Sequence, residues 1–528
     1  MSNQEQAQQL FFAALAAQNA GRLAKAEQLY REALALAPGR PSLLNNLASV
    51  LRDLSRHEEA LNMSAALVLA APGDAQSWIT RASIYTALGD SLSAASDLLQ
   101  ATRLDPENAA LQLLLGTTLL EGGQPGQAIR CLRQVFSAQP GDPQAACQLA
   151  NALLRAFQPD EAIHCCDKAL ALDPRHADAW LNRANALLQL GRYDEALHGY
   201  SNVQQLAPGS PRAWWNESLL RLLLGDLERG WKLYEYGWAT GQRGMQRPRF
   251  TAPAWDGRPL EGDLLVWAEQ GIGDQILFGT MLEELRPLAR QVIVAAAPRL
   301  LPLLQRSLPG LRFVSGEAVD PQLPVAAQAA MGDLGGFLRG SADRFPQRAG
   351  YLRADAARAA ALRARLLPAD QRLLVGLSWR SRNDHFGALK SLDPGQLAPL
   401  LALPGITAVD LQYGDTAAER AMLQQKHGIT LQHCDDIDNF NDLDGLAALI
   451  EACDVVVSVS NTTVHLAGAL GKPTLVLLPF ALGRIWYWHQ HGERSLWYPS
   501  CRLLRQPQPG DWASPVAQAL AEINKLLN

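Results

Sequence analysis

The chain has 528 residues, 48% of them hydrophobic, which is enough for two or three folded domains. Its net charge of −5 offers no basic surface for nucleic acid, and no apolar run approaches the roughly 20 residues of a membrane helix. The amino terminus lacks the basic region of a signal peptide, and seven cysteines without paired metal spacing suit a reducing compartment, so we expect a cytoplasmic protein.

The first part of the chain repeats itself every 34 residues. Prolines recur at this interval, at Pro38, Pro72, Pro106, Pro140, Pro174 and Pro208. A second position is always small: Ala14, Ala48, Ala82, Gly116, Ala150, Ala184 and Ser218. A third holds glycine at 21, 89, 123, 191 and 225, with Ser55 and Phe157 as exceptions. Prolines between helices, turn glycines and small contact residues are typical of tetratricopeptide repeats, so we predict a solenoid of about six and a half repeats over residues 1–240.

One polar position recurs in the first helix of the predicted repeats, two residues before the small residue. It holds Asn46, Thr80, Gln148, Asn182 and Asn216, and Leu114 interrupts the series. An asparagine amide offers both a donor and an acceptor to an extended peptide. Asn46, Asn182 and Asn216 are therefore candidate acceptor-binding residues. The alternative is that they are solvated polar residues on a helix face.

The 34-residue sequence pattern ends near residue 240. Trp231, Tyr234 and Trp238 share one helical face, and we interpret them as a seam that docks the solenoid onto the next domain. Residues 241–262 contain arginine, glycine and proline with little apolar periodicity, which predicts a linker.

Short apolar runs then alternate with helix-like stretches. Strands are predicted at residues 264–268, 291–296, 373–379, 406–411, 454–458 and 474–478, and helices at 275–289, from 393, at 442–452 and from 463. This alternation predicts an α/β fold with parallel sheets. Because the pattern starts again near residue 372, we predict two doubly wound Rossmann-like halves, 263–370 and 371–528, with a ligand cleft at the carboxyl ends of their strands.

Two loops carry candidate chemistry. Asp274 ends the sequence Gly-Ile-Gly-Asp just after the first predicted strand, where a carboxylate could accept a proton; the alternative is a helix cap. Asn461, Thr462, Thr463 and His465 lie where a loop enters a helix, a place that favours an anion such as phosphate. The alternative there is a buried structural histidine with threonine caps.

These loops resemble those of a known enzyme family. Glu269-Gln-Gly-Ile-Gly-Asp-Gln-Ile276 resembles the amino-terminal loop of the ADP-heptose transferases, and Val457 to Pro473 resembles their donor-phosphate motif. The stretch His465-Leu-Ala-Gly-Ala-Leu-Gly471 and the segment Trp497 to Gln506 also resemble bacterial fusions of tetratricopeptide repeats with a glycosyltransferase, some of them implicated in protein glycosylation, flagellin included. The arrangement is similar to that of protein O-GlcNAc transferase, whose repeat arm carries an asparagine ladder.

The resemblance implies a fold and a set of roles. It implies a GT-B core, with the amino-terminal half on the acceptor side, the carboxyl-terminal half on the nucleotide-sugar side, and Asp274 as the catalytic base. The heptosyltransferase pattern has Asp-Ser-Gly where this chain has Ser460-Asn461-Thr462, so an identical ADP-heptose site is not expected.

A polar loop from Trp379 to Leu392 opens the second half. Its place matches a heptosyltransferase loop whose lysine meets the donor phosphate, which makes Lys390, with the adjacent Ser391, a candidate; Arg380 and Arg382 are alternatives, and a merely solvated loop is another. Gln412 and Tyr413 follow the next strand and are candidates to contact a base or ribose, with strand-end packing as the alternative.

These residues together predict a protein glycosyltransferase. We expect it to move a sugar from a nucleotide-sugar substrate to a Ser or Thr hydroxyl of a protein recruited by the repeats, with inversion. No Asp-x-Asp motif lies in a convincing loop, so we expect no metal and no cofactor. The alternatives are a glycan or lipid glycosyltransferase whose repeats serve assembly, and a non-catalytic adaptor. The sugar, the nucleotide, the acceptor and the oligomeric state stay open.

Overall fold

The computed structural model describes residues 2–383 and 386–528. Asp384 and His385 of the polar loop lie outside the described residues. The chain divides into two compact units, residues 1–189 and 190–528. The division falls inside the predicted solenoid rather than near residue 240.

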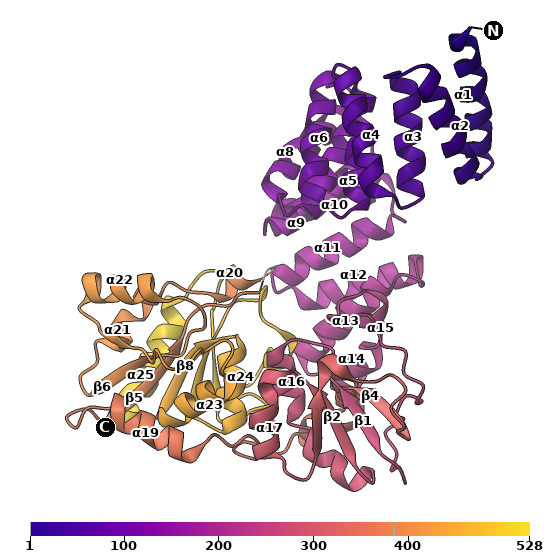
Figure 1. Ribbon diagram of the computed structural model, residues 1–528. Helices are drawn as coiled ribbons and strands as arrows, with labels where there is room; N and C mark the ends of the chain where they lie inside the picture. Colours follow the sequence, from indigo (N-terminus) through magenta and orange to yellow (C-terminus); the bar gives the residue numbers. More distant parts are fainter. Residues whose placement is uncertain (1, 384–385) are drawn as a thin grey trace. The chain divides into compact units, whose positions relative to one another are not determined.

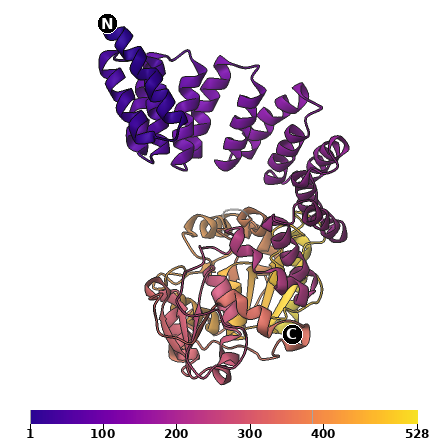
Figure 2. The same cartoon turned by 90° about the vertical axis from the view of Figure 1, so that its right-hand side faces the viewer.

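The first unit is a stack of helix pairs. In both Figure 1 and Figure 2 the helices of neighbouring pairs lie side by side. Its elements are α1 (Asn3–Asn19), α2 (Leu23–Leu36), α3 (Pro41–Asp53), α4 (His57–Ala70), α5 (Ala75–Ala87), α6 (Ser91–Leu104), α7 (Ala109–Glu121), α8 (Pro125–Ala138), α9 (Pro143–Arg155), α10 (Pro159–Leu172) and α11 (Ala177–Gln189). Buried alanines and leucines between neighbouring helices form its core.

The 34-residue period is visible in the backbone. The even-numbered helices of this unit, α2 to α10, each end two residues before a recurring proline. The recurring glycines adopt a left-handed conformation, as at Gly89 with φ 77°. Ser55 (φ 59°) and Phe157 (φ 57°) adopt it too, although it is costly for a residue with a Cβ. The left-handed turn is therefore present even in the two repeats in which serine or phenylalanine replaces the glycine.

The second unit begins with four more helices: α12 (Tyr193–Leu206), α13 (Pro211–Leu224), α14 (Leu227–Leu233) and α15 (Tyr236–Ala239). The aromatic seam packs here against the α/β region. The indole N–H of Trp231 donates to the carbonyl of Arg339 at 3.0 Å, and its ring lies 5.3 Å from that of Trp486. The backbone N–H of Gln490 donates to the carbonyl of Leu223. These contacts explain why the last repeat helices belong to the second unit.

The strands of the described chain form two all-parallel sheets. The first contains β1 (Leu264–Trp267), β2 (Val292–Ala296), β3 (Arg312–Ser315) and β4 (Ala327–Ala330), in the order β3-β2-β1-β4. The second contains β5 (Leu373–Ser378), β6 (Ile406–Asp410), β7 (Leu431–Gln432), β8 (Val455–Val459), β9 (Thr474–Leu478) and β10 (Cys501–Arg505), in the order β10-β9-β8-β5-β6-β7. The strand order reverses beside β1 and beside β5, as in doubly wound folds. The predicted parallel α/β architecture is confirmed.

Further helices lie between the strands or follow the last of them. They are α16 (Ile272–Gly279), α17 (Leu301–Ser307), α18 (Leu334–Leu338), α19 (Ala356–Leu366), α20 (Gly387–Lys390), α21 (Ala398–Leu401), α22 (Ala417–His427), α23 (Leu443–Ala452), α24 (Thr462–Leu470) and α25 (Ala513–Leu527). The predicted helix 275–289 is instead α16 followed by a 3₁₀ helix, Leu282–Leu288, which contains Pro287. Among the described helices, none has the length and apolar character needed to cross a bilayer.

Candidate functional site

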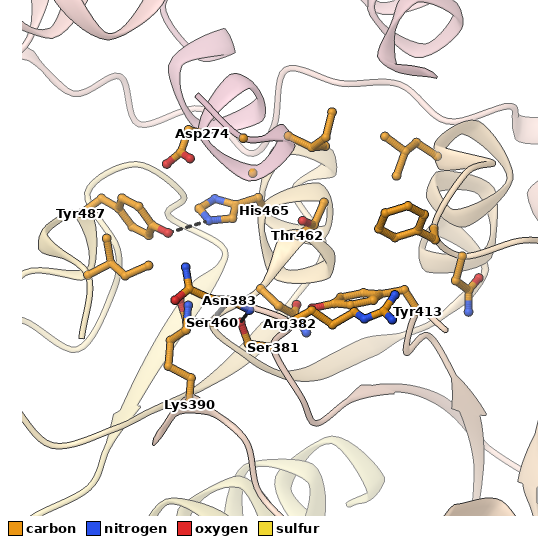
Figure 3. A pocket seen from close by; sticks show the side chains of 18 of the residues that line it. Asp274, Ser381, Arg382, Asn383, Lys390, Tyr413, Ser460, Thr462, His465 and Tyr487 are labelled. Carbon is orange, nitrogen blue, oxygen red and sulfur yellow. Dashed lines mark hydrogen bonds between the residues drawn. The ribbon is translucent and has the colours of Figure 1, made fainter. Parts of the chain in front are cut away.

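A cavity of about 300 Å³ opens at the carboxyl ends of both sheets (Figure 3). Its wall is built from segments that each follow a strand. Gly271 to Asp274 follow β1, Ser381 to Asn383 and Lys390 follow β5, and Ser460 to Thr462 follow β8. Ligands of doubly wound sheets bind at this edge, where the strand order reverses. The cavity is therefore the candidate site.

Asp274 is the third residue of α16, whose N-cap is Gly271. Its carboxylate accepts hydrogen bonds from the backbone N–H groups of Gly271 and of Asp274 itself, so it helps to cap the helix while it lines the cavity. Burial, reinforced by the charge of Glu269 and opposed by that of Lys390, raises the pKa of Asp274 to about 6. The carboxylate is therefore still mostly ionised at neutral pH, yet far more basic than an ordinary aspartate.

Glu269 connects Asp274 to the predicted linker. Its Oε1 accepts from Nη2 of Arg243 at 2.7 Å and from the backbone N–H of Gly332 at 3.1 Å. Arg243 is fully buried, pairs also with Asp333, and stacks 4.2 Å from the ring centre of Trp238. The buried guanidinium of Arg243, which belongs to the predicted linker, therefore pairs with Glu269 in the loop that carries Asp274.

Lys390 brings positive charge to the same cavity. Its side chain is buried, and no hydrogen bond or ion pair holds its ammonium group within the described residues. Burial lowers the pKa of Lys390 to about 8, against the opposing pull of the Asp274 carboxylate. Arg382 also lines the cavity, and so does Arg299, whose guanidinium lies 4.5 Å from the ring centre of Phe440. The cavity can therefore receive an anion.

His465 is buried between two tyrosines. Its Nδ1 lies 3.1 Å from the hydroxyl of Tyr498 and its Nε2 lies 3.2 Å from the hydroxyl of Tyr487. Burial, with a smaller effect of Lys390, lowers the pKa of His465 to about 3, so the ring is neutral. The expected contact of the imidazole with a donor phosphate does not fit this arrangement, because both ring nitrogens are bonded to protein hydroxyls. In the view of Figure 3, His465 and Tyr487 lie between Asp274 and Lys390.

The amino end of α24 is capped by Asn461, the residue that precedes the helix. Oδ1 of Asn461 accepts from the N–H groups of Thr463 and Val464, and its Nδ2 donates to Ser378 and to the carbonyl of Arg380. Asn461 and Thr462 line the cavity, whereas the buried Thr463 does not. Two of the helix N–H groups expected to bind phosphate are thus already satisfied by Asn461.

Three other candidates are not among the residues that line the cavity. Oε1 of Gln412 accepts from Ser378 and from the N–H groups of Trp379 and Arg380, an arrangement that favours the strand-end packing alternative. Arg380 pairs with Glu419 at 2.8 Å. Ser391 bonds within its own loop, to Ser381 and Gly387. Each of these side chains is used to hold the loops that follow β5 and β6.

Tyr413 does line the cavity. Its hydroxyl accepts from the backbone N–H of Arg382 at 2.8 Å, and its ring centre lies 6.2 Å from that of Phe440. The two rings and the Arg299 guanidinium above Phe440 offer a surface on which a planar aromatic group can stack.

The asparagines of the repeats are engaged within the solenoid. Asn46 donates to the hydroxyl of Tyr30, Asn182 donates to the carbonyl of Cys147, and Asn216 hydrogen-bonds Tyr200. These side chains therefore do not form the free ladder that the sequence suggested. Their amides tie the first helix of a repeat to the repeat before it.

Several lining residues were missed by the sequence reasoning: Arg299, Asn383, Asn439, Phe440, Leu443, Ile485 and Tyr487. Tyr487 stands in a run of three aromatic residues after β9, Trp486-Tyr487-Trp488, and that run was a usable signal. The others carry no distinctive local pattern. Only the sheet order brings them to one cavity.

Comparisons with known proteins match the repeats. Models of the tetratricopeptide repeat match residues 11–75, 85–151 and 147–211. The chain is 32% identical over 312 residues to Protein FlbA of Caulobacter vibrioides, an alignment that covers 55% of this chain and 51% of FlbA. The chain thus spans about half the length of that relative.

Solved structures of repeat proteins are also similar. They include YrrB, described as a TPR protein with an unusual peptide-binding site, at 22% identity and TM-score 0.32 over 36% of this chain and 98% of YrrB. A repeat protein from Parabacteroides merdae matches at 18% identity and TM-score 0.40 over 45% of this chain and 94% of its own. The matches of the repeat models show that the amino-terminal region is a tetratricopeptide-repeat solenoid, and it is followed by an α/β region of parallel sheets.

Proposed function

We propose that this protein is a glycosyltransferase of GT-B type that moves a sugar from a nucleotide-sugar donor to a hydroxyl of an acceptor protein. Tetratricopeptide repeats commonly mediate protein–protein contacts, and the solenoid is the part that recruits the acceptor. The α/β region performs the transfer. The proposed acceptor groups are Ser or Thr hydroxyls, and flagellin is one candidate acceptor.

The reaction requires a base and a stabilised leaving group. The acceptor oxygen attacks the anomeric carbon, its proton passes to the Asp274 carboxylate, and the bond from that carbon to the donor phosphate oxygen breaks. The electron pair of that bond stays on the phosphate. Lys390 and Arg382 supply positive charge for it, so the chemistry does not require a metal ion. A direct displacement of this kind inverts the anomeric centre.

One observation carries the proposal: Asp274 and Lys390 line one cavity at the carboxyl ends of two doubly wound sheets. A carboxylate of raised pKa and an ammonium group without a hydrogen-bond or ion-pair partner in the described part of the chain are the two charges that the displacement needs. Tyr413 and Phe440 add a stacking surface for a nucleobase in the same cavity. The resemblance of the Gly-Asp loop to the heptosyltransferases supports the same assignment.

Donor turnover provides the first test. The purified protein is incubated with UDP-, GDP-, ADP- and CMP-sugars, and released nucleotide is measured with and without candidate acceptor proteins. Asp274→Asn keeps the size of the side chain and removes the base, so turnover should fall by roughly two to four orders of magnitude. Retained turnover in that variant would refute the assignment of the base.

The role of the repeats is tested by deleting residues 1–189, which leaves the second compact unit. We expect donor binding to persist and transfer to protein to be lost. Undiminished transfer to protein would instead favour an enzyme whose repeats serve only assembly.

A further inference from the structure

His465 stands at the centre of a chain of hydroxyl groups that reaches the cavity wall. Tyr498 bonds its Nδ1 and Tyr487 bonds its Nε2, and Ser460 lies close to Tyr487 on the cavity wall. Tyr487 and Ser460 line the cavity, whereas Tyr498 lies behind the imidazole and does not. The direction of each hydrogen bond decides what this wall presents to a ligand.

The hydroxyl of Tyr498 fixes the tautomer of His465. Tyr498 is buried, and within the described residues its hydroxyl has one hydrogen-bond partner, Nδ1 of His465. A buried O–H without an acceptor is costly, so this hydroxyl donates and Nδ1 accepts. Because the ring is neutral, Nε2 then carries the proton and donates to the oxygen of Tyr487. This assignment follows from the hydrogen-bond network.

The next two hydroxyl groups, those of Tyr487 and Ser460, carry more hydrogens than the described residues offer acceptors for them. Oγ of Ser460 accepts from the indole N–H of Trp488 at 2.8 Å. Tyr487 and Ser460 hold two hydroxyl hydrogens, and a hydrogen bond between these two groups can use at most one of them. The imidazole is a donor here and cannot take the second, and no other acceptor for it lies within the described residues. The remaining hydroxyl hydrogen therefore faces the cavity.

We propose that the Tyr487–Ser460 hydroxyl pair is a hydrogen-bond donor to an anionic oxygen of the ligand, with His465 as the positioning residue that fixes its direction. The inference rests on the proposed nucleotide-sugar site. Lys390 and Arg382 line the same cavity, so the acceptor that this donor meets is a phosphate oxygen of a nucleoside diphosphate. His465 thus acts on the phosphate through Tyr487 and not by contact.

The experiment measures dissociation constants by calorimetry for UDP, GDP, ADP and CDP and for the four nucleosides. It compares the full-length protein with Tyr487→Phe, Ser460→Ala and the double variant. In either single variant the remaining hydroxyl can still donate, so each should lose less than about threefold in diphosphate affinity. The double variant should lose roughly ten- to a hundredfold for the diphosphate that binds, with nucleoside affinity unchanged.

The matched control is Tyr236→Phe, which removes a hydroxyl from a ring that stacks on Trp214 away from the cavity. It should bind like the unaltered protein. A double variant that binds the diphosphate within threefold of the unaltered protein overturns the inference alone, and so does an equal loss for the nucleoside. If the unaltered protein binds no diphosphate at millimolar concentration, the proposed function and the inference both fail.

A second readout does not depend on any ligand. In protein with ¹⁵N-labelled histidine, the His465 signals are assigned by their loss in His465→Gln. The nitrogen shifts should report a neutral ring with the proton on Nε2. A proton on Nδ1 would overturn the inference.

Discussion

The carboxylate of Asp274 and the ammonium group of Lys390 line one cavity, although Asp274 follows β1 of the first sheet and Lys390 follows β5 of the second. Each charge favours the ionised form of the other, while burial disfavours both. The result is a carboxylate with a pKa of about 6 and an ammonium group with a pKa of about 8. Both groups are mostly charged in the window between these values.

Transfer should have a bell-shaped pH dependence. Below about pH 6 the Asp274 carboxylate is protonated and cannot accept the proton of the acceptor, and above about pH 8 Lys390 loses the charge that meets the phosphate. The measurement is kcat/KM between pH 5 and 9.5. In Lys390→Arg the alkaline limb should move beyond this range, because a guanidinium stays charged. An alkaline limb unchanged by that substitution would exclude Lys390 as its source.

Glu269→Gln should move the acid limb to lower pH. The Glu269 charge raises the pKa of Asp274, and a glutamine removes that charge while its amide oxygen can still accept from Arg243 and Gly332. The same pH profile measures the shift. Glu228→Gln, which changes an exposed carboxylate paired with Lys232, is the control and should leave the limb in place. A limb that does not move in Glu269→Gln would contradict the coupling.

Arg243→Met should destabilise the second unit by about 3–5 kcal/mol. The substitution leaves the buried Glu269 without its cation, and it also removes the stacking on Trp238. Chemical denaturation, followed by tryptophan fluorescence, measures the loss. Arg249→Met changes an exposed residue of the same segment and should stay within about 0.5 kcal/mol of the unaltered protein. Equal stability of the two variants would show that the buried pair contributes little.

Ser55→Gly should stabilise the first unit by about 0.5–1 kcal/mol. Ser55 holds a left-handed conformation with φ 59°, where its Cβ is strained and glycine is not. Thermal denaturation of the two variants checks the sign. The reverse exchange at the equivalent turn, Gly89→Ser, should destabilise by a similar amount, since Gly89 has φ 77°. A loss of stability in Ser55→Gly would mean that the serine makes a compensating contact.

The secondary structure could largely be predicted because it depends on neighbours in sequence. The 34-residue period placed the helix ends, and apolar runs located β1, β2, β5, β6, β8 and β9. The strands β3, β4, β7 and β10 were missed. β7 has two residues, and β4 is Ala-Gln-Ala-Ala, so neither carries a strong apolar pattern.

Some of the predicted site residues line the cavity and others do not. Asp274, Lys390, Tyr413, Asn461, Thr462 and His465 all line the cavity, and their catalytic and binding roles stay predictions. Gln412, Ser391 and Arg380 do not line it and bond to Ser378, Gly387 and Glu419 within the protein, so their ligand contacts also stay predictions. A motif locates a residue at a strand end, but it does not say which neighbour its polar atoms bond.

The sequence by itself determined a repeat solenoid followed by parallel α/β structure, with Asp274 and His465 in segments that follow strands. These features follow from local periodicity and turn chemistry, which are written in consecutive residues. Only the tertiary structure decided that α12–α15 fold with the sheets, that Arg243 is buried against Glu269, and that Tyr487 and Tyr498 enclose His465. Those relationships join segments far apart in the chain, and packing selects such partners by shape and by the need to satisfy buried polar groups.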